Sequence, residues 1–441
     1  MTERDPEPAA HRRGFLKTGT AASVGIVLSS ASKARSAAGS ETLKLGVIGC
    51  GGRGAGAANQ AMNADDGVVL HAMCDVDRTV LDTAHEILMK QQEGRVDVPE
   101  DRRFSGFEDY KRVIEQCDVV ILATSPGFRP QHFEEAVAQG KHVFMEKPVA
   151  TDVHGIKRVL AAGKEAAAKN LKVGVGLQRR HQPGYQDWIR RIQDGDIGDV
   201  LTIRALWNGS SRAGKPRREG ESELEYQIRN WYYFTWLSGD HNVEQHVHNL
   251  DVANWIMGEQ HVVVARGMGG REVRDKLENG QIYDHHFVEY EYADGTLLYS
   301  QARQIPNCWR LIGETAVGTL GRAEFQQRLF TISGPNAATK RFRRNEDGHQ
   351  LEHYPLFRAI REDLPHNEAE RGAHATMTAI LGRMANYSGQ EVTWDDAMAS
   401  DQRLVPDDLF DFRSDPPVHP DAEGRYPIAV PGVTDPFAVW Y

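Results

Sequence analysis

The sequence has little of what marks several specialised classes of protein. Only four of its 441 residues are cysteine, with no C-x-x-C spacing, so no disulfide-rich scaffold or cysteine zinc site is indicated and we expect buried free thiols. No apolar run reaches the roughly 18 residues that a membrane-spanning helix needs. The net charge is -10, without a basic block beyond the N-terminus, which argues against a nucleic-acid partner. What remains is an ordinary globular composition, long enough for two domains.

The first 40 residues have the features of an export signal. Residues 11–17, HRRGFLK, closely resemble the twin-arginine signal, although His11 stands where Ser or Thr is usual. A mildly apolar stretch follows at 21–28, and small residues at 36–38 offer a cleavage site. Because twin-arginine substrates are exported folded, we expect a periplasmic or otherwise extracytoplasmic protein, exported with any cofactor already bound.

Residues 43–61 are the most informative stretch of the chain. They read as a short apolar strand, a G-x-G-x-x-G turn with glycines at 49, 51 and 54, and an alanine-rich helix. Gly49 allows the tight turn, Gly51 lets the backbone approach a pyrophosphate, and Gly54 lets the helix pack closely on its strand. The helix N-terminus then directs its positive end at the phosphates. This context predicts a dinucleotide site.

A carboxylate at the end of the next strand indicates which dinucleotide binds. The apolar run 68–74 ends at Asp75, 21 positions after Gly54. Asp75 is placed to accept hydrogen bonds from the adenosine ribose hydroxyls, and it repels a 2′-phosphate. The sequence therefore favours NAD, and Arg78 nearby keeps NADP as the alternative.

The pattern of strands and helices divides the chain. Strands and helices alternate to about residue 177, which predicts α/β architecture with a doubly wound parallel sheet. Strand-like runs at 200–207, 261–266, 285–292 and 296–304 follow without intervening helices, so we expect a second, α+β domain on a large, mostly antiparallel sheet. We expect a loop at 334–353 and a helix at 371–388. The predicted domains are a signal at 1–40, a Rossmann domain at 41–170, an α+β substrate and oligomerisation domain at 171–400, and an extended tail at 401–441.

Two segments carry groups for acid–base chemistry. Lys147 follows the last strand of the nucleotide domain in Glu146-Lys147-Pro148, where ligands of doubly wound sheets bind. Its ammonium group can bind a substrate hydroxyl and lower the pKa of the reacting alcohol. In residues 239–251, Glu244 and His248 are four positions apart and share a helical face, so the carboxylate can orient His248 as a general base. This cluster of His and carboxylates also raises a metal site as an alternative, but it lacks H-E-x-x-H order, and we predict no metal.

Further polar and aromatic residues are candidates for binding the substrate. The aromatic run around Trp231, Tyr232 and Trp236 is either core or a platform on which sugar rings stack. Arg179 and Arg180 follow a strand beside Gln178, and we expect only one of the two arginines to have a pocket role. The predicted substrate-binding set is Gln178, Arg179, Arg180, Trp231, Tyr232, Trp236 and His246.

Taken together, these motifs resemble the family of glucose-fructose oxidoreductase, inositol dehydrogenase and rhizopine catabolism proteins (Gfo/Idh/MocA), in its exported branch. The resemblance covers roughly residues 43–400. It rests on residues 49–54, 123–124 with Pro126 and His132, 140–143, 146–148, and 244–258.

The resemblance implies a Rossmann domain, a sheet domain used for homo-oligomer contacts (a dimer or tetramer), tightly held NAD or NADP, and a sugar or polyol substrate. It makes Lys147 the catalytic lysine, with a cis bond to Pro148, and His248 the histidine of the second motif. Glu244 stands where relatives have Asp. The cofactor-binding residues that it implies, together with the loop and Asp75, are Gly49, Gly51, Gly52, Arg53, Gly54, Asp75, Arg78, Thr124, Pro126, His132, Glu146 and Lys147.

Three functions remain open at this stage. The first is a dehydrogenase in which Lys147 and His248 remove a hydroxyl proton while a hydride leaves the same carbon for NAD. The second is an NAD-dependent glycoside hydrolase that oxidises a ring hydroxyl transiently, eliminates the aglycone, adds water and reduces back. The third is a binding protein that has lost turnover, against which the intact Lys147 and His248 argue.

Overall fold

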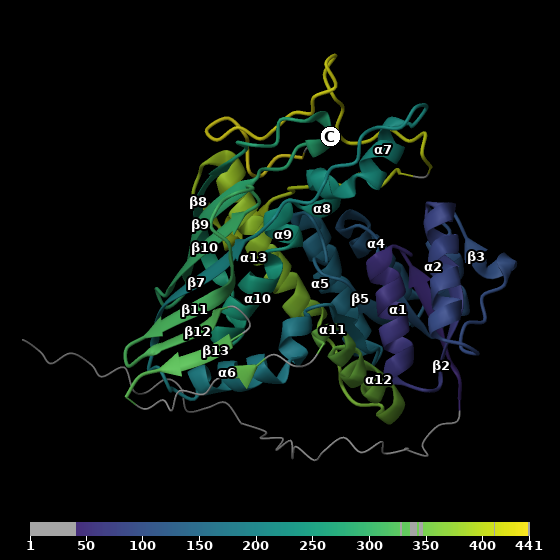
Figure 1. The fold of residues 1–441 in the computed structure, drawn as a ribbon, viewed down its shortest axis with the longest axis horizontal. Helices are drawn as coiled ribbons and strands as arrows, with labels where there is room; N and C mark the ends of the chain where they lie inside the picture. The colour runs from purple at the N-terminus through teal and green to yellow at the C-terminus, as the bar shows by residue number, and fades with distance from the viewer. Residues whose placement is uncertain (1–40, 327–328, 336–341, 344–346, 410, 440–441) are drawn as a thin grey trace, which may run out of the picture. The chain divides into compact units, whose positions relative to one another are not determined.

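The structure is a computed structural model that describes residues 41–326, 329–335, 342–343, 347–409 and 411–439 (Figure 1). The predicted export signal, residues 1–40, lies outside the described residues. Glu41–Tyr441 form one compact unit. None of the helices in the described part combines the length and the apolar character that a membrane crossing requires.

The N-terminal half is built on a six-stranded parallel sheet in the order β3-β2-β1-β4-β5-β6. This is the strand order of doubly wound nucleotide-binding folds, and it confirms the predicted α/β architecture. The central strands β1 and β4 are almost entirely buried, because helices cover both faces of the sheet. The elements are β1 Leu43–Ile48, α1 Gly52–Ala64, β2 Val68–Cys74, α2 Arg78–Gln91, β3 Arg103–Phe104, α3 Tyr110–Gln116, β4 Val119–Leu122, α4 Arg129–Ala138, β5 His142–Met145, α5 Val153–Ala168 and β6 Val173–Val175.

The C-terminal half is built on a nine-stranded sheet in the order β14-β13-β12-β11-β7-β10-β9-β8-β15. Only the β7–β10 pair is parallel, so the prediction of a mostly antiparallel sheet is confirmed. Helices α6 Pro183–Gln193, α10 Val247–Ile256 and α13 Ala369–Ser388 pack on one face (Figure 1). Buried residues alternate with partly exposed ones along β9 and β10, as expected for a sheet with one open face. The strands are β7 Val200–Asn208, β8 Val262–Gly270, β9 His285–Tyr292, β10 Leu297–Arg303, β11 Leu311–Gly318, β12 Arg322–Gln326, β13 Leu329–Ser333, β14 Phe342–Arg343 and β15 Val392–Thr393.

One hydrophobic core joins the two halves. It includes β5 and β6 of the first sheet, β7 to β9 of the second, and helices α5, α10 and α13 between them. The long helix α13 packs on α5 on one side and on β8 on the other. This shared core holds the carboxyl ends of the parallel strands against the segment around α10.

The loop prediction for residues 334–353 was wrong in its described part. Short helix α11 Gly348–Leu351 and helix α12 His353–Glu362 occupy this region and the residues after it. Asp347 caps α11 by accepting a hydrogen bond from the His349 N–H at 3.1 Å. The apolar side of α12, with Leu356 and Phe357, packs into the core of the nucleotide domain. The apolar residues that bind α12 to the core, Leu356 and Phe357, come after the polar stretch 334–353. The composition of that stretch therefore did not indicate a helix.

The tail and the cysteines complete the description. No helix of residues 401–439 is seen in the described part, yet Leu404, Leu409 and Tyr426 are buried against Trp236 and its neighbours. All four cysteines are free. Cys50, Cys74 and Cys117 are buried as expected, whereas Cys308 is partly exposed.

Candidate active site between the two sheets

The glycine loop has the geometry that its sequence predicts. Gly49 has φ +90°, and a Cβ added there would lie 2.5 Å from the Thr124 nitrogen. A Cβ on Gly54 would lie 1.9 Å from the Gly49 carbonyl oxygen, so α1 packs directly on the turn. A Cβ on Gly51 would meet no atom within 4 Å. Gly51 therefore faces open space, as needed where backbone amides approach a pyrophosphate.

Asp75 lies beside this turn. Its carboxylate accepts hydrogen bonds from the Cys50 N–H at 2.7 Å and from the Asp77 N–H at 2.9 Å. Burial raises the pKa of Asp75, while these backbone bonds lower it. Arg78, in contrast, is bound to Asp82 at 2.9 Å and to Glu100 at 2.5 Å on an exposed helix surface. The arrangement favours a ribose hydroxyl at Asp75 over a 2′-phosphate at Arg78.

Four of the predicted cofactor contacts have protein partners, namely Arg53, Glu146, Thr124 and His132. Arg53 forms an ion pair with Glu146 at 2.7 Å, which connects the glycine loop to the Glu146-Lys147-Pro148 segment. His132 is buried between the rings of Tyr110 and Phe128, and burial lowers its pKa to about 3. Its Nδ1 lies 3.3 Å from Thr124 Oγ1, so His132 supports Thr124 from behind. Pro126 opens the 3-10 turn η2 Pro126–Phe128, and Gly52 begins α1 without close neighbours.

Lys147 meets the second motif directly. The Lys147–Pro148 peptide bond is cis, and Lys147 Nζ donates to the Glu244 carbonyl oxygen at 2.6 Å and to Glu244 Oε1 at 3.3 Å. The expectation that Glu244 orients His248 was wrong. Short helix α9 His241–Glu244 ends at Glu244, and α10 starts only at Val247, so the two side chains do not share one continuous helix.

His248 nevertheless lies close to Lys147. The side chain is buried, and its ring stacks on Trp207 with centroids 6.2 Å apart and planes at 23°. Burial lowers the pKa of His248 well below its usual value, and the positive charges of Lys147 and Arg179 lower it further. The imidazole is therefore neutral at neutral pH and can accept a proton.

A cavity of about 570 Å³ opens beside Trp207, whose ring stacks on His248, although neither Lys147 nor His248 is among the residues that line it. Arg179 lines it, is ion-paired with Glu314, and has its guanidinium 5.9 Å from the Trp207 ring. Arg180 instead binds Asp251 at 2.8 Å and Glu259 at 2.7 Å away from the cavity. Only one arginine thus has a pocket position. The cavity is lined by Gln178, Arg179, Gln182, Tyr185, Trp207, Asn208, Gly209, Ser210, Arg310, Leu311, Ile312 and Phe325.

The tryptophan that lines the cavity is one that the sequence analysis did not predict. Trp236 is buried in a core cluster and donates its Nε1 hydrogen to Gln227 at 2.8 Å. Tyr232 is buried and accepts from Gln304 Nε2 at 2.7 Å, and Trp231 packs edge-on against it. Trp207 lines the cavity instead. Its only sequence signal is an aromatic residue at the end of a strand, before Asn208-Gly209.

His246 was also predicted at the substrate and is not there. The side chain is completely buried, with Nε2 2.7 Å from Ser300 Oγ. Burial lowers its pKa to about 3. His246 therefore attaches the start of α10 to β10 as a neutral group.

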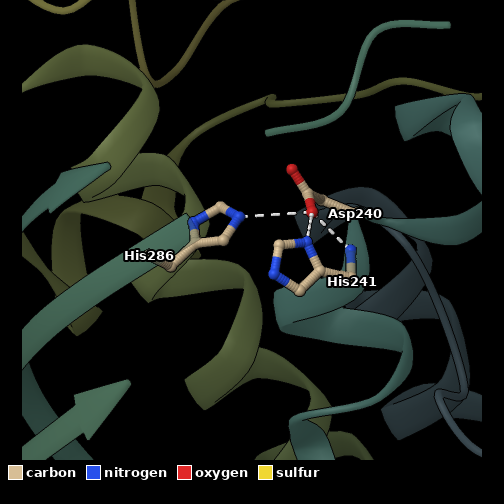
Figure 2. A group of neighbouring side chains, drawn as sticks. All are labelled: Asp240, His241 and His286. Carbon is tan, nitrogen blue, oxygen red and sulfur yellow. Dashed lines mark hydrogen bonds and ion pairs between the residues drawn. The ribbon is translucent and has the colours of Figure 1, made fainter. Parts of the chain in front are cut away.

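The possible metal cluster is a hydrogen-bonded carboxylate (Figure 2). One ligand atom each of Asp240, His241 and His286 lies within 4.8 Å of the others. Asp240 Oδ1 accepts from the His241 N–H and contacts His241 Nδ1 at 2.7 Å and His286 Nε2 at 3.2 Å. Asp240 Oδ2 accepts from the Tyr283 N–H at 3.0 Å and the Tyr387 O–H at 2.5 Å. Both oxygens of Asp240 therefore have protein neighbours, whereas His241 Nδ1, His241 Nε2 and His286 Nε2 form no hydrogen bond in the described part of the chain.

Comparison with known proteins supports the nucleotide-binding part of this description. Residues 43–176 match the family model GFO_IDH_MocA, described as an oxidoreductase family with an NAD-binding Rossmann fold. This part of the chain is similar to the Gfo/Idh/MocA oxidoreductases. An inositol 2-dehydrogenase of Klebsiella pneumoniae (strain 342) is 28% identical over 291 residues, 63% of this chain and 74% of that protein.

Solved structures share the fold of this chain. A scyllo-inositol dehydrogenase from Lactobacillus casei with bound NAD(H) and scyllo-inositol has a TM-score of 0.60 at 21% identity, covering 80% of this chain and 99% of that one. An aldose-aldose oxidoreductase from Caulobacter crescentus has a TM-score of 0.63 at 18% identity, covering 80% and 100%. The glycine loop, with Gly51 open and Asp75 beside it, fits NAD as the cofactor.

Proposed function

We propose that the protein is an NAD-dependent oxidoreductase that transfers a hydride between NAD and a hydroxyl-bearing carbon of a sugar, polyol or sugar derivative. The observation that carries this proposal is the contact of Lys147 Nζ with Glu244. The Arg53–Glu146 ion pair connects this segment to the glycine loop, and the charge of Lys147 acts on His248. The names of similar proteins, which include inositol 2-dehydrogenase and levoglucosan dehydrogenase, support a substrate of this class.

The acid–base roles follow from the charges at the site. NAD, when bound, takes up the hydride. The Lys147 ammonium group, held by Glu244, donates a hydrogen bond to the substrate oxygen and stabilises negative charge there. His248 is neutral at neutral pH because burial and two nearby cations lower its pKa, and the neutral imidazole is the form that accepts the hydroxyl proton. Trp207 offers its face to the sugar ring, and Arg179 and Gln178 offer donors to hydroxyl groups.

Substitution of the two acid–base residues tests this assignment. We expect Lys147→Met and His248→Asn to lower kcat by about 10²- to 10⁴-fold while NADH still binds, because the glycine loop and Asp75 remain intact in both variants. His419→Asn, on the exposed tail, is the matched control. Oxidation is followed as NADH absorbance with a panel of polyols, free sugars and glycosides. Undiminished turnover in both folded variants would refute the assignment.

A glycoside hydrolase with internal redox chemistry is the second candidate. The cavity continues past Trp207 to Gln182, Ser210 and Arg310, which leaves room for a group attached to the sugar. Release of an aglycone by protein that retains its NAD, without accumulation of NADH, would select this function. Accumulating NADH with a free sugar or polyol would select the dehydrogenase.

We also propose export and self-association. Residues 11–17 support export by the twin-arginine route into an extracytoplasmic compartment, and fusion of residues 1–40 to a folded reporter tests it in an export-deficient strain. The open face of the nine-stranded sheet carries apolar side chains such as Met268, 71% exposed, and Val317, 37% exposed, which supports a homo-oligomer. Light scattering of wild type and Met268→Asp tests this, and a wild-type monomer would overturn it.

A further inference from the structure

The segment that follows the second sheet brings ionisable side chains to the cofactor side of the site. α11 packs against α1 and against the 3-10 turn η3 Gln178–His181. A Cβ added to Gly348 would lie 2.8 Å from the Gln178 carbonyl oxygen, so the approach is close. His349, the next residue, therefore lies between the glycine-loop helix and the cavity-lining residues. Its side chain is 35% exposed.

Glu352 is a buried carboxyl group without the partners that a carboxylate needs. Its side chain is 0% exposed, and its Oε1 lies 3.5 Å from His349 Nδ1. Among the described residues, no donor forms a hydrogen bond with either oxygen of Glu352, and His349 Nδ1 has no hydrogen-bond partner either. Burial raises the pKa of Glu352 well above its usual value, and the charge of Glu146 raises it further. Since an unpaired buried carboxylate is very costly, Glu352 holds a proton at neutral pH.

His349 is also within electrostatic reach of the proposed acid–base residues. Burial lowers the pKa of His349, and Arg53 and Lys147 lower it further, whereas Glu146 raises it. The pKa of His248 is in turn lowered in part by His349. The charged and titratable groups that face the pair from the neighbouring segments are Arg53, Glu146, Lys147, His181, His248, Asp347, His353 and Glu368.

We propose that His349 and Glu352 form a proton-transfer pair that connects the Lys147–His248 site with solvent. His248 is buried and Lys147 is bound to Glu244, so a proton taken from the substrate needs a group that faces both the site and water. His349 is partly exposed to water, lies on α11 where this helix packs against η3, and interacts electrostatically with Lys147 and His248. Glu352 is a positioning residue, because a carboxyl group facing Nδ1 determines which ring nitrogen of His349 carries the proton.

The inference rests on the proposed oxidoreductase function and completes its proton balance. Oxidation of a hydroxyl to a carbonyl breaks one C–H and one O–H bond. The hydride leaves with the cofactor, and the proton passes from the substrate oxygen to His248, through water in the crevice to His349, and from His349 to bulk solvent. Reduction of a carbonyl uses the same route in the opposite direction. Glu352 starts and ends each cycle protonated.

The pair itself can be tested without a substrate. In histidine-labelled protein, an NMR titration should show that neutral His349 carries its proton on Nε2, because the protonated carboxyl group of Glu352 donates its hydrogen to Nδ1. Glu352→Ala should abolish this preference for one tautomer. Glu362→Ala, at the exposed far end of α12, is the matched control. His349→Gln assigns the signal. An unchanged His349 tautomer in Glu352→Ala would overturn the pair.

Turnover tests the connection to solvent. We expect His349→Ala to lower kcat about 10- to 100-fold with KM and NADH affinity unchanged, and to increase the solvent deuterium isotope effect. Added imidazole should restore part of the rate, because the position is one-third exposed. Unchanged kcat and pH profile in this variant would overturn the proton route. Failure of the wild type to reduce NAD with any sugar or polyol would overturn the proposed function instead, and the NMR titration would still decide the pair.

Discussion

Alanine substitutions in the glycine loop separate cofactor binding from folding. Gly51 has φ −60°, which any residue adopts, and an added Cβ there meets no atom within 4 Å. At Gly54 the same Cβ would lie 1.9 Å from the Gly49 carbonyl oxygen. One added methyl group is therefore accommodated at the first position and requires backbone movement at the second.

The expected magnitudes differ accordingly. In Gly51→Ala, the loss of a favourable helix N-cap residue and the reduced entropy of the unfolded chain nearly cancel, so the free energy of unfolding changes by less than about 1 kcal/mol. A methyl group that faces a bound pyrophosphate crowds it, and overpacking of this kind costs about 1–3 kcal/mol of binding free energy. This cost lowers NAD affinity by about 5- to 140-fold. Gly54→Ala should lower the free energy of unfolding by about 1–3 kcal/mol even without cofactor.

Two measurements check this reasoning. Urea unfolding of nucleotide-free protein gives the stability of each variant, and NADH fluorescence titration gives its affinity. If Gly51→Ala binds NADH as tightly as wild type, the pyrophosphate does not approach this turn. If Gly54→Ala unfolds at the wild-type urea concentration, α1 does not pack on the turn as described.

Three further outcomes follow from the site. Trp207→Ala should raise KM for a sugar about tenfold or more through lost stacking area, while NADH affinity stays constant; an unchanged KM would remove Trp207 from the substrate site. Arg78→Ala should leave the preference for NAD over NADP unchanged because Arg78 is bound to Asp82 and Glu100, whereas Asp75→Asn should increase NADP affinity in the same titration. Asp240→Asn should lower the free energy of unfolding by about 3–5 kcal/mol. Burial alone would raise the pKa of Asp240, but His286 and His241 hold this pKa well below its usual value. The stabilisation that Asp240 provides is therefore present above about pH 4, its pKa in the unfolded chain, and is lost as the pH falls. Equal urea midpoints for wild type and Asp240→Asn at pH 7 would contradict this.

The nucleotide-binding half of the fold could be predicted because its signals are local. A strand, three glycines and a helix occupy consecutive residues, and Asp75 follows at a fixed distance along the next strand. Each of these features depends on backbone geometry within a few residues. The structure therefore reproduces the roles of Gly49, Gly51 and Gly54 closely.

The residues at the substrate side were predicted less well. A run of aromatic residues such as the one around Trp231 and Trp236 occurs both in hydrophobic cores and in sugar-binding surfaces, so its composition does not distinguish the two. In the structure, Trp236 is buried in a core cluster. The spacing of Glu244 and His248 indicated one helix, but the chain turns at residues 245–246 and Glu244 binds Lys147. Trp207, His349 and Glu352 had no local motif that marked them.

The sequence by itself determined the class of cofactor site, the α/β architecture with its second sheet, and the lysine and histidine that carry the proposed chemistry. These follow from short-range patterns of glycine, charge and periodicity. Only the tertiary structure decided which polar groups far apart in the sequence meet, as Lys147 and Glu244 do although 97 positions separate them. It also decided which buried groups, such as Glu352, have no hydrogen-bond partner among the described residues. Burial and pairing depend on packing between distant segments, and that packing determines which ionisable residues are neutral at the site.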